Sequence, residues 1–284
     1  MKIIVTGAGG QLGEELVELL RPLNELLGFT HADLDITAGG KVKEIVKKID
    51  PDAIVNAAAY TDVDGAESEP GCAFAVNASG VKWLTEVAED VDAQLVHIST
   101  DYVFSGDKPE PYTIEDCPHP INTYGVSKLG GEYFALHYSG GTVIRTSGVY
   151  GGEPGKHDNI VNTVLDFTRE QAELTFVVDQ ISAPTWSRPV AGAVQTVLEE
   201  KITGLLHFTA AGQCSPFEFT KFLIQELEID IPIKPIKSRD LNLSASRPKN
   251  SVLENSWQAE SWKKMLQDYL YSISHRISFN QSLN

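Results

Sequence analysis

The chain has 284 residues, of which 42% are hydrophobic and 22% charged, enough for one large α/β unit or two unequal domains. Its formal net charge of −16, from 23 basic and 39 acidic residues, argues against nucleic acid or an anionic membrane surface as a general partner. No apolar run approaches the roughly 20 residues that a membrane helix needs.

Compartment and metal content can also be predicted. The apolar run near the start is too short for the core of a signal peptide, which favours a cytoplasmic protein. Cys72, Cys117 and Cys214 lie far apart and show no CxxC spacing, and no two histidines have the i, i+4 spacing of a metalloprotease helix. We therefore expect neither a disulfide nor a metal site.

The first half alternates buried apolar runs with amphipathic segments. Strands are predicted at 2–7, 24–30, 52–59, 93–100 and 141–147, and helices at 9–23, 40–49, about 70–90 and from residue 124 onward. Repeated β–α units with short connections predict an α/β fold, a Rossmann-type doubly wound parallel sheet with helices on both faces.

After about residue 150 the alternation loosens. A Gly/Pro-rich loop at 151–159 precedes further predicted elements: helices at about 157–169, 188–200 and 215–227, strands at 173–179 and 204–210, and a loop-rich segment at 232–253. We expect a dinucleotide-binding domain over 1–148, to which some later elements return. Residues 149–284 would form mainly a smaller C-terminal α/β substrate-binding domain.

The first turn carries the nucleotide signal. "TGAGGQLG" places Gly7, Gly10 and Gly13 directly between the first strand and the first helix. Glycines at that turn let the backbone approach a pyrophosphate, which then lies at the helix N-terminus. The GxxGxxG spacing is typical of the short-chain dehydrogenase/reductase class, so we expect a nicotinamide cofactor.

The end of the second strand bears on which cofactor is used. An NAD-preferring site usually has an acid there, but this chain reads Thr30-His31, and the next acids are Asp33 and Asp35. No acid repels a 2′-phosphate and no arginine binds one, which favours NADPH and leaves NADH open. Asp35, with Ile36, either lies beside the adenine or belongs to the N-cap region of the next helix.

Three side chains predict the chemistry. Thr100 ends the fourth strand, at the edge where parallel sheets bind ligands, and Tyr124 and Lys128 lie one turn apart at the start of the next helix. Tyr124 would donate the proton in a carbonyl reduction, Lys128 would favour its phenolate, and Thr100 would polarise the carbonyl. Asp101 would orient either that hydroxyl or the substrate.

Motifs along nearly the whole chain resemble those of the dTDP-4-dehydrorhamnose reductase family, which belongs to the extended short-chain dehydrogenases. They are "TGAGGQLG", "DAIVNAAAYTDVDGAESEP", "HISTDYVFSG", "PINTYGVSKLGGE", "VIRTSGVYG", "VVDQISAPTW" and "SRPKNSVL". The resemblance implies an NADPH-dependent oxidoreductase that reduces the 4-keto group of dTDP-4-dehydro-L-rhamnose to give dTDP-L-rhamnose. It also implies a place in dTDP-rhamnose and cell-surface polysaccharide biosynthesis.

The resemblance implies site residues as well. Thr100, Tyr124 and Lys128 match the catalytic positions, and Thr100, Asp101, Tyr124, Gly148 and Arg247 are the expected substrate contacts. The cofactor positions are Gly7, Gly10, Gln11, Leu12, Gly13, Asp35, Ile36, Ala59, Tyr60, Thr61, Tyr124 and Lys128.

Two of the expected substrate contacts leave a choice open. Where the family usually reads RTSW this chain reads "RTSG", so Gly148 replaces a tryptophan of the substrate pocket, and the sugar or its nucleotide can differ. Arg247 either binds the diphosphate or ties its loop to the core.

Alternatives remain at this stage. One is a reductase of a different nucleotide keto-sugar, and another is an epimerase or dehydratase of the same superfamily. A third is a non-catalytic NADP-binding regulatory subunit resembling that of methionine adenosyltransferase. A homodimer is common in the superfamily. Turnover of a keto-sugar would exclude the regulatory subunit, whereas a co-purifying synthetase would favour it.

Overall fold

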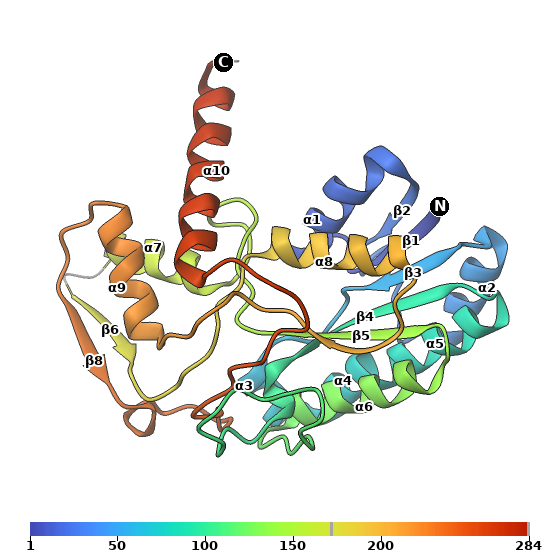
Figure 1. The fold of residues 1–284 in the computed structure, drawn as a ribbon, viewed down its shortest axis with the longest axis horizontal. Coiled ribbons are helices and arrows are strands. Elements are labelled where there is room, and N and C mark those ends of the chain that lie inside the picture. The colour runs from blue at the N-terminus through green and yellow to red at the C-terminus, as the bar shows by residue number, and fades with distance from the viewer. Residues whose placement is uncertain (171–172, 283–284) are drawn as a thin grey trace.

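Apolar runs of the sequence form a six-stranded parallel sheet in the computed structural model, which describes residues 1–170 and 173–282 (Figure 1). The strands are β1 (Lys2–Thr6), β2 (Glu25–Phe29), β3 (Ala53–Asn56), β4 (Gln94–Thr100), β5 (Gly141–Thr146) and β7 (Gly204–His207). Their order is β2-β1-β3-β4-β5-β7, and every neighbouring pair is parallel. The strand order reverses between β1 and β3, the place where ligands bind in open α/β sheets.

Helices cover both faces of the sheet because successive strand side chains point in opposite directions. Ile3 and Val5 of β1 pack in one core with α1 (Gln11–Leu20) and α8 (Ser187–Glu200), and Ile4 packs in a second core on the other face. The helices on that second face are α2 (Gly39–Ile49), α5 (Val81–Asp90) and α6 (Thr123–His137). The predicted doubly wound Rossmann-type sheet is confirmed.

Helices α1 and α8 are joined across a long stretch of sequence. The guanidinium of Arg188, at the start of α8, lies 3.3 Å from a carboxylate oxygen of Glu15 and 3.1 Å from one of Glu18, both on α1. The separation of Arg188 from Glu15 is 173 residues. Two elements beyond position 148 thus belong to the sheet layer: β7 pairs with β5, and α8 packs against α1.

The single helix predicted near 70–90 is divided. Three segments cover the region: α4 (Pro70–Phe74), a π-helical stretch (Ala75–Gly80) and α5; a short helix, α3 (Val63–Ser68), precedes them. The wide π turn holds Asn77, a buried polar residue, whose amide bonds both backbone groups of Tyr60 at 2.8 and 3.0 Å and the hydroxyl of Ser127 at 2.9 Å. Asn77 thus fixes the loop after β3 to α6.

A second lobe has its own core. Its elements are α7 (Ile160–Glu170), β6 (Leu174–Val177), α9 (Pro216–Glu226), β8 (Ile233–Ile236) and α10 (Trp262–Ser282). Strands β6 and β8 form a two-stranded parallel sheet, and Tyr150, Phe219 and Tyr269 are among the aromatic residues of the core. Short 3₁₀ turns occur at Ser238–Asp240 after β8 and, in the sheet region, at Arg21–Leu23 after α1 and Asp101–Val103 after β4.

Strand β8 lies within the segment that the sequence predicts as loop-rich, so that prediction is wrong for residues 233–236. Its sequence is IKPI, and the proline suggested a loop. Proline is tolerated at the edge of a sheet, because an edge strand leaves outward-facing N–H groups unpaired. In a two-stranded sheet, β8 is such an edge.

Candidate active site

Thr100 stands at the carboxyl end of β4. It is buried, its side-chain oxygen accepts the backbone N–H of Tyr102 at 3.2 Å, and its hydroxyl donates to the carboxylate of Asp101 at 3.2 Å. The strand thus ends in a capped 3₁₀ turn that holds both side chains at the sheet edge. This is the placement that the sequence predicts.

Helix α6 brings the other two catalytic candidates to the same edge. Asn122 caps it by accepting the backbone N–H of Gly125 at 2.7 Å, and its own amide donates to the carbonyl of Ser246 at 2.8 Å. Lys128 is 2% exposed, and its ammonium donates to the carbonyl of Ile98 on β4 at 2.6 Å. The helix is therefore tied to the strand that carries Thr100.

The protonation of the pair follows from its burial. Burial raises the pKa of Tyr124 to about 12, and a hydrogen bond with Thr100 opposes that rise. Burial lowers the pKa of Lys128 to about 8, opposed by the charge of Glu132. The phenol is thus fully protonated near neutrality and ready to donate.

Two cavities meet at these residues. One, of about 230 Å³, is lined by Asp101, Tyr102, Ser182 and Ser251, and the other, of about 450 Å³, by Gln11, Leu12, Lys128 and other residues. Both are lined by Thr61, Thr100, Tyr124 and Gly148. The candidate proton donor and the candidate polarising hydroxyl therefore lie where the two cavities join.

The larger of these cavities begins at the glycine turn and fits a pyrophosphate. Gly7 has a φ of +72°, and a Cβ on Gly13 would lie 2.0 Å from the carbonyl oxygen of Gly7, so the turn has no room for a side chain there. Gly10 caps α1 without a side chain, which leaves backbone N–H groups at the helix N-terminus for an anion. These residues fit the dinucleotide that the sequence predicts.

A third cavity, of about 420 Å³, lies on the other side of the glycine turn, towards the end of β2. It is lined by Gly7, Gly10, Thr30, His31, Asp35, Ile36, Ala59 and Tyr60, among others, so it gathers the remaining predicted cofactor residues. Asp35 accepts the backbone N–H and hydroxyl of Thr37 at 2.9 and 2.8 Å, before α2. Its carboxylate thus stabilises the turn before α2, whose N-cap residue is Ala38, and Asp35 also lines the cavity.

Gln11 joins the glycine turn to the second lobe. Its side-chain amide donates to the carbonyl of Val149 at 2.9 Å and accepts from the amide of Asn159 at 2.7 Å. One turn along α1, Glu14 contacts Lys156 at 2.7 Å and His157 at 3.1 Å. His157 also lines the larger cavity, a position that sequence reasoning missed because no motif marks it.

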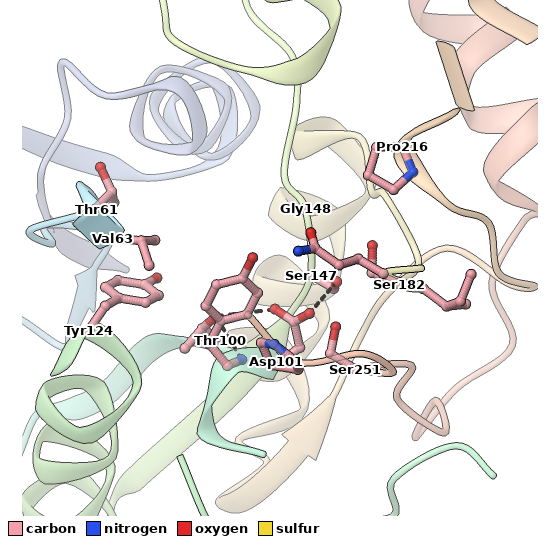
Figure 2. A pocket seen from close by; sticks show the side chains of 14 residues that line it. Thr61, Val63, Thr100, Asp101, Tyr124, Ser147, Gly148, Ser182, Pro216 and Ser251 are labelled. Atoms are coloured by element: carbon pink, nitrogen blue, oxygen red, sulfur yellow. Dashed lines mark hydrogen bonds between the residues drawn. The ribbon is translucent and has the colours of Figure 1, made fainter. Parts of the chain in front are cut away.

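Most of the residues that line the smaller cavity have polar side chains, which the sequence did not reveal (Figure 2). Asp101 is 3% exposed and accepts the hydroxyl of Ser147 at 2.7 Å. Burial raises the pKa of Asp101 to about 6, opposed by hydrogen bonds from Ser251, Ser147 and Thr100. The serines come from distant segments, so only the fold brings them together.

Gly148 lines both of these cavities. Its φ is +50°, and a Cβ there would lie 3.2 Å from the Cα of Pro184. The absent side chain leaves the two cavities joined at this point.

Arg247 is not among the residues that line these cavities, but the next residue, Pro248, lines the smaller one. Its guanidinium forms an ion pair with Asp64 on α3, through one bond of 2.9 Å and a second, shorter one, and donates to the carbonyl of Ala245 at 2.7 Å. The backbone N–H of Ala245 also donates to Asp64 at 2.8 Å. Of the two predicted roles, the contacts favour tying the loop to the core.

A buried ion pair between Glu132 and Arg145 joins α6 to β5. Glu132, one turn beyond Lys128, accepts Arg145 of β5 through two bonds of 2.9 and 2.7 Å and the hydroxyl of Ser99 at 2.5 Å. Both charged side chains are at most 2% exposed. The sequence shows that Glu132 lies one helical turn after Lys128. It does not show that Glu132 pairs with Arg145 on β5.

Across residues 1–170 and 173–282, no group of three or more His, Cys, Asp and Glu side chains is placed to hold a metal ion. None of the helices described there is long and apolar enough to cross a membrane.

Known proteins are similar to this chain over nearly its whole length. Residues 1–279 match the family model described as RmlD substrate binding domain. A dTDP-4-dehydrorhamnose reductase of Burkholderia thailandensis is 37% identical over 96% of this chain and 97% of its own length. A dTDP-4-keto-6-deoxy-D-glucose reductase of Streptomyces niveus is 34% identical over 90% of this chain and 89% of its own.

A solved structure is similar throughout. The crystal structure of dTDP-4-dehydrorhamnose reductase from Bacillus anthracis, in complex with NADP, has a TM-score of 0.92 and 35% identity, covering 96% of this chain and 100% of that one.

Proposed function

Because the chain belongs to the dTDP-4-dehydrorhamnose reductase family, we propose that it reduces the 4-keto group of dTDP-4-dehydro-L-rhamnose with NADPH, giving dTDP-L-rhamnose. One observation carries the proposal. Thr100 and Tyr124 line both the cavity that begins at the glycine turn and the polar cavity beside it, so they would lie between cofactor and keto-sugar. NADH would be the weaker cofactor.

The dinucleotide would be held by the glycine turn, Gln11 and Leu12 at one end and by Asp35, Ile36, Ala59 and Tyr60 at the other. When bound, the reduced nicotinamide supplies a hydride to the carbonyl carbon. The phenol of Tyr124 gives its proton to the carbonyl oxygen, and the hydroxyl of Thr100 stabilises the charge that develops there. Tyr124 then regains a proton from solvent.

Lys128 acts through its charge. Held against the carbonyl of Ile98, its ammonium stabilises the phenolate that remains when Tyr124 has donated. Asp101, with Ser147, would accept a hydroxyl of the sugar. Arg247 remains a proposed contact of the diphosphate, with the structural role favoured by its pair with Asp64.

The test follows the loss of reduced-nicotinamide absorbance with dTDP-4-dehydro-L-rhamnose, using NADPH and NADH. General acid catalysis contributes roughly 100- to 10,000-fold, so Tyr124→Phe should lower kcat by at least about 100-fold. Tyr133→Phe is the matched control, because Tyr133 lies on the same helix and is 60% exposed. Equal rates for Tyr124→Phe and Tyr133→Phe would contradict the assigned proton donor.

Gly148 makes a second substrate worth testing, because it has no side chain to separate the smaller cavity from the larger one, which would hold the cofactor. The relative from Streptomyces niveus is named for a dTDP-4-keto-6-deoxy-D-glucose, so this ketone is the alternative to test beside the first. Turnover of it at a higher kcat/KM would identify it as the substrate. A regulatory subunit would need the cofactor cavity but not Thr100, Tyr124 and Lys128 gathered beside it.

Compartment and assembly are part of the proposal. Cys72 and Cys117 are exposed and unpaired, as expected of a chain kept in the reducing cytoplasm.

Val126 and Tyr133 are exposed on one face of α6, beside α4, where Phe74 is exposed as well. Such an apolar face would suit a homodimer, and sedimentation equilibrium at twice the 31.0 kDa of one chain would test it.

A further inference from the structure

Glu132 is a buried charged residue to which the proposed chemistry gives no role. It lies one helical turn after Lys128 on α6 and is 1% exposed. Its carboxylate accepts the hydroxyl of Ser99 on β4 at 2.5 Å and two bonds from Arg145 on β5 at 2.9 and 2.7 Å. Because a buried ion pair is often no more stabilising than apolar residues of similar volume, this pair beside the candidate site points to a role beyond stability.

The partners of Glu132 belong to one row across the sheet. Ser99 pairs in register with Arg145, and Arg145 pairs with His207 on β7. The guanidinium of Arg145 lies 3.4 Å from Nε2 of His207 and 5.0 Å from the centre of the Phe104 ring. Burial, and next the charge of Arg145, lower the pKa of His207 to about 4, so this imidazole is neutral and its Nε2 can accept from the guanidinium. The cation that binds Glu132 is therefore itself held in place.

This row lies directly before the hydroxyl that would polarise the carbonyl. The carbonyl of Ile98 accepts the ammonium of Lys128 at 2.6 Å, and the next residue of β4 binds Glu132. The residue after that is Thr100. Helix α6 is thus attached to the end of β4 at two points one turn apart, which fixes its position and its rotation. These two points determine where Tyr124 lies relative to Thr100.

The charge of Glu132 also acts on Lys128. Burial lowers the pKa of Lys128 to about 8, and the charge of Glu132 opposes that fall. Two further titratable groups near Lys128 are neutral near neutrality: burial raises the pKa of Tyr124 to about 12, and burial with the charge of Lys128 holds the pKa of His97 on β4 well below its usual range. Without the carboxylate, Lys128 would have the unpaired cation of Arg145 as its neighbour and would lose its proton more easily.

We propose that Glu132 is a positioning residue that keeps Lys128 charged and Tyr124 in place for proton transfer. Glu132 is not among the described residues that line the two cavities meeting at Tyr124, so it acts only through the helix and through its charge. The inference rests on the proposed function, because the proton transfer is assigned there.

The pH dependence of kcat separates positioning from stability. Glu132→Gln keeps the shape of the side chain but removes its charge, so kcat should fall at least about tenfold, since a misplacement of about 1 Å can cost about 100-fold. The alkaline limb of kcat, where Lys128 loses its proton, should move to lower pH, while KM for NADPH stays nearly unchanged. Glu132→Asp keeps the charge and shortens the side chain, so it should lower kcat but leave the limb in place.

Val46→Ala is the control for stability, because Val46 is fully buried on α2 and lines none of the described cavities. It should lower the melting temperature and leave kcat and the alkaline limb as in the native chain. Ser99→Ala removes one hydrogen bond to Glu132 and no charge, so kcat should fall by a smaller factor with the limb unchanged. If Glu132→Gln does not fold, native kcat in both Glu132→Asp and Ser99→Ala would overturn the proposal.

A second measurement needs no turnover. NMR titration of a chain with isotope-labelled lysine, in which the Lys128 signal is assigned by its loss in Lys128→Met, follows the protonation of Lys128 directly. The midpoint should be lower in Glu132→Gln than in the native chain, and an equal midpoint would overturn the proposal. A lowered midpoint in a chain that does not reduce dTDP-4-dehydro-L-rhamnose would uphold the effect of Glu132 on Lys128 and contradict only the proposed reaction.

Discussion

Replacing Glu132 with glutamine tests how α6 is held on the sheet. The buried carboxylate accepts three hydrogen bonds, two from Arg145 at 2.9 and 2.7 Å and one from Ser99 at 2.5 Å, and it interacts electrostatically with Lys128 one turn away. Glutamine keeps the shape of the side chain but leaves the Arg145 guanidinium, 2% exposed, without a counter-charge.

Leaving one member of a buried pair without its partner costs about 3–5 kcal/mol of unfolding free energy. At roughly 2–3 °C per kcal/mol for a chain of this size, the melting temperature should fall by roughly 6–15 °C. The surface pair Lys43–Glu86 gives a matched control, because its ions lie 2.6 Å apart and both side chains are more than a third exposed. Glu86→Gln should cost less than about 1 kcal/mol.

Urea and thermal unfolding followed by circular dichroism would measure both variants. A double variant, Glu132→Met with Arg145→Met, should recover most of the loss, since removing both charges leaves no unpaired ion. The reasoning is refuted if Glu132→Gln unfolds no more easily than Glu86→Gln, or if the double variant is less stable than Glu132→Gln alone.

Two further predictions concern the substrate side. Burial raises the pKa of Asp101 to about 6 from 3.8, so the folded chain binds the extra proton and loses stability as pH rises between about 4 and 6. Asp101→Asn should therefore gain up to about 3 kcal/mol over the native chain between pH 4 and pH 7 in urea titrations, and a constant difference would contradict this. If Arg247 only ties its loop to Asp64, Arg247→Met and Asp64→Asn should weaken dTDP binding equally in calorimetry, whereas a larger loss in Arg247→Met would make Arg247 a diphosphate ligand.

What could be predicted from the sequence was local. The glycine turn is a run of eight residues, and Tyr124 and Lys128 are one helical turn apart. Both patterns can therefore be recognised without knowledge of the fold. The strand that ends at Thr100 was equally visible as an apolar run. Because parallel strands end at a common edge, these three local signals were enough to predict that the residues meet.

The remainder depends on distant parts of the chain. Ser147 and Ser251 meet Asp101 from segments about a hundred residues apart, and no spacing rule connects them. Asn77 lies in a π turn, a departure from helical geometry that the 3.6-residue period conceals. The strand at 233–236 is not evident from the sequence, because it has only four residues and one of them is a proline, which is rare inside strands.

The position of α8 and β7 late in the sequence affects how the chain folds. β5 gains its outer neighbour, and α1 its covering helix, only after residue 187 has been made, and Arg188 reaches back 173 residues to Glu15. Contacts of such long sequence separation are slow to form. During synthesis the edge of β5 would thus stay unpaired and the apolar face of α1 uncovered until about three-quarters of the chain has been made, which leaves this edge and face open to wrong pairing in the meantime.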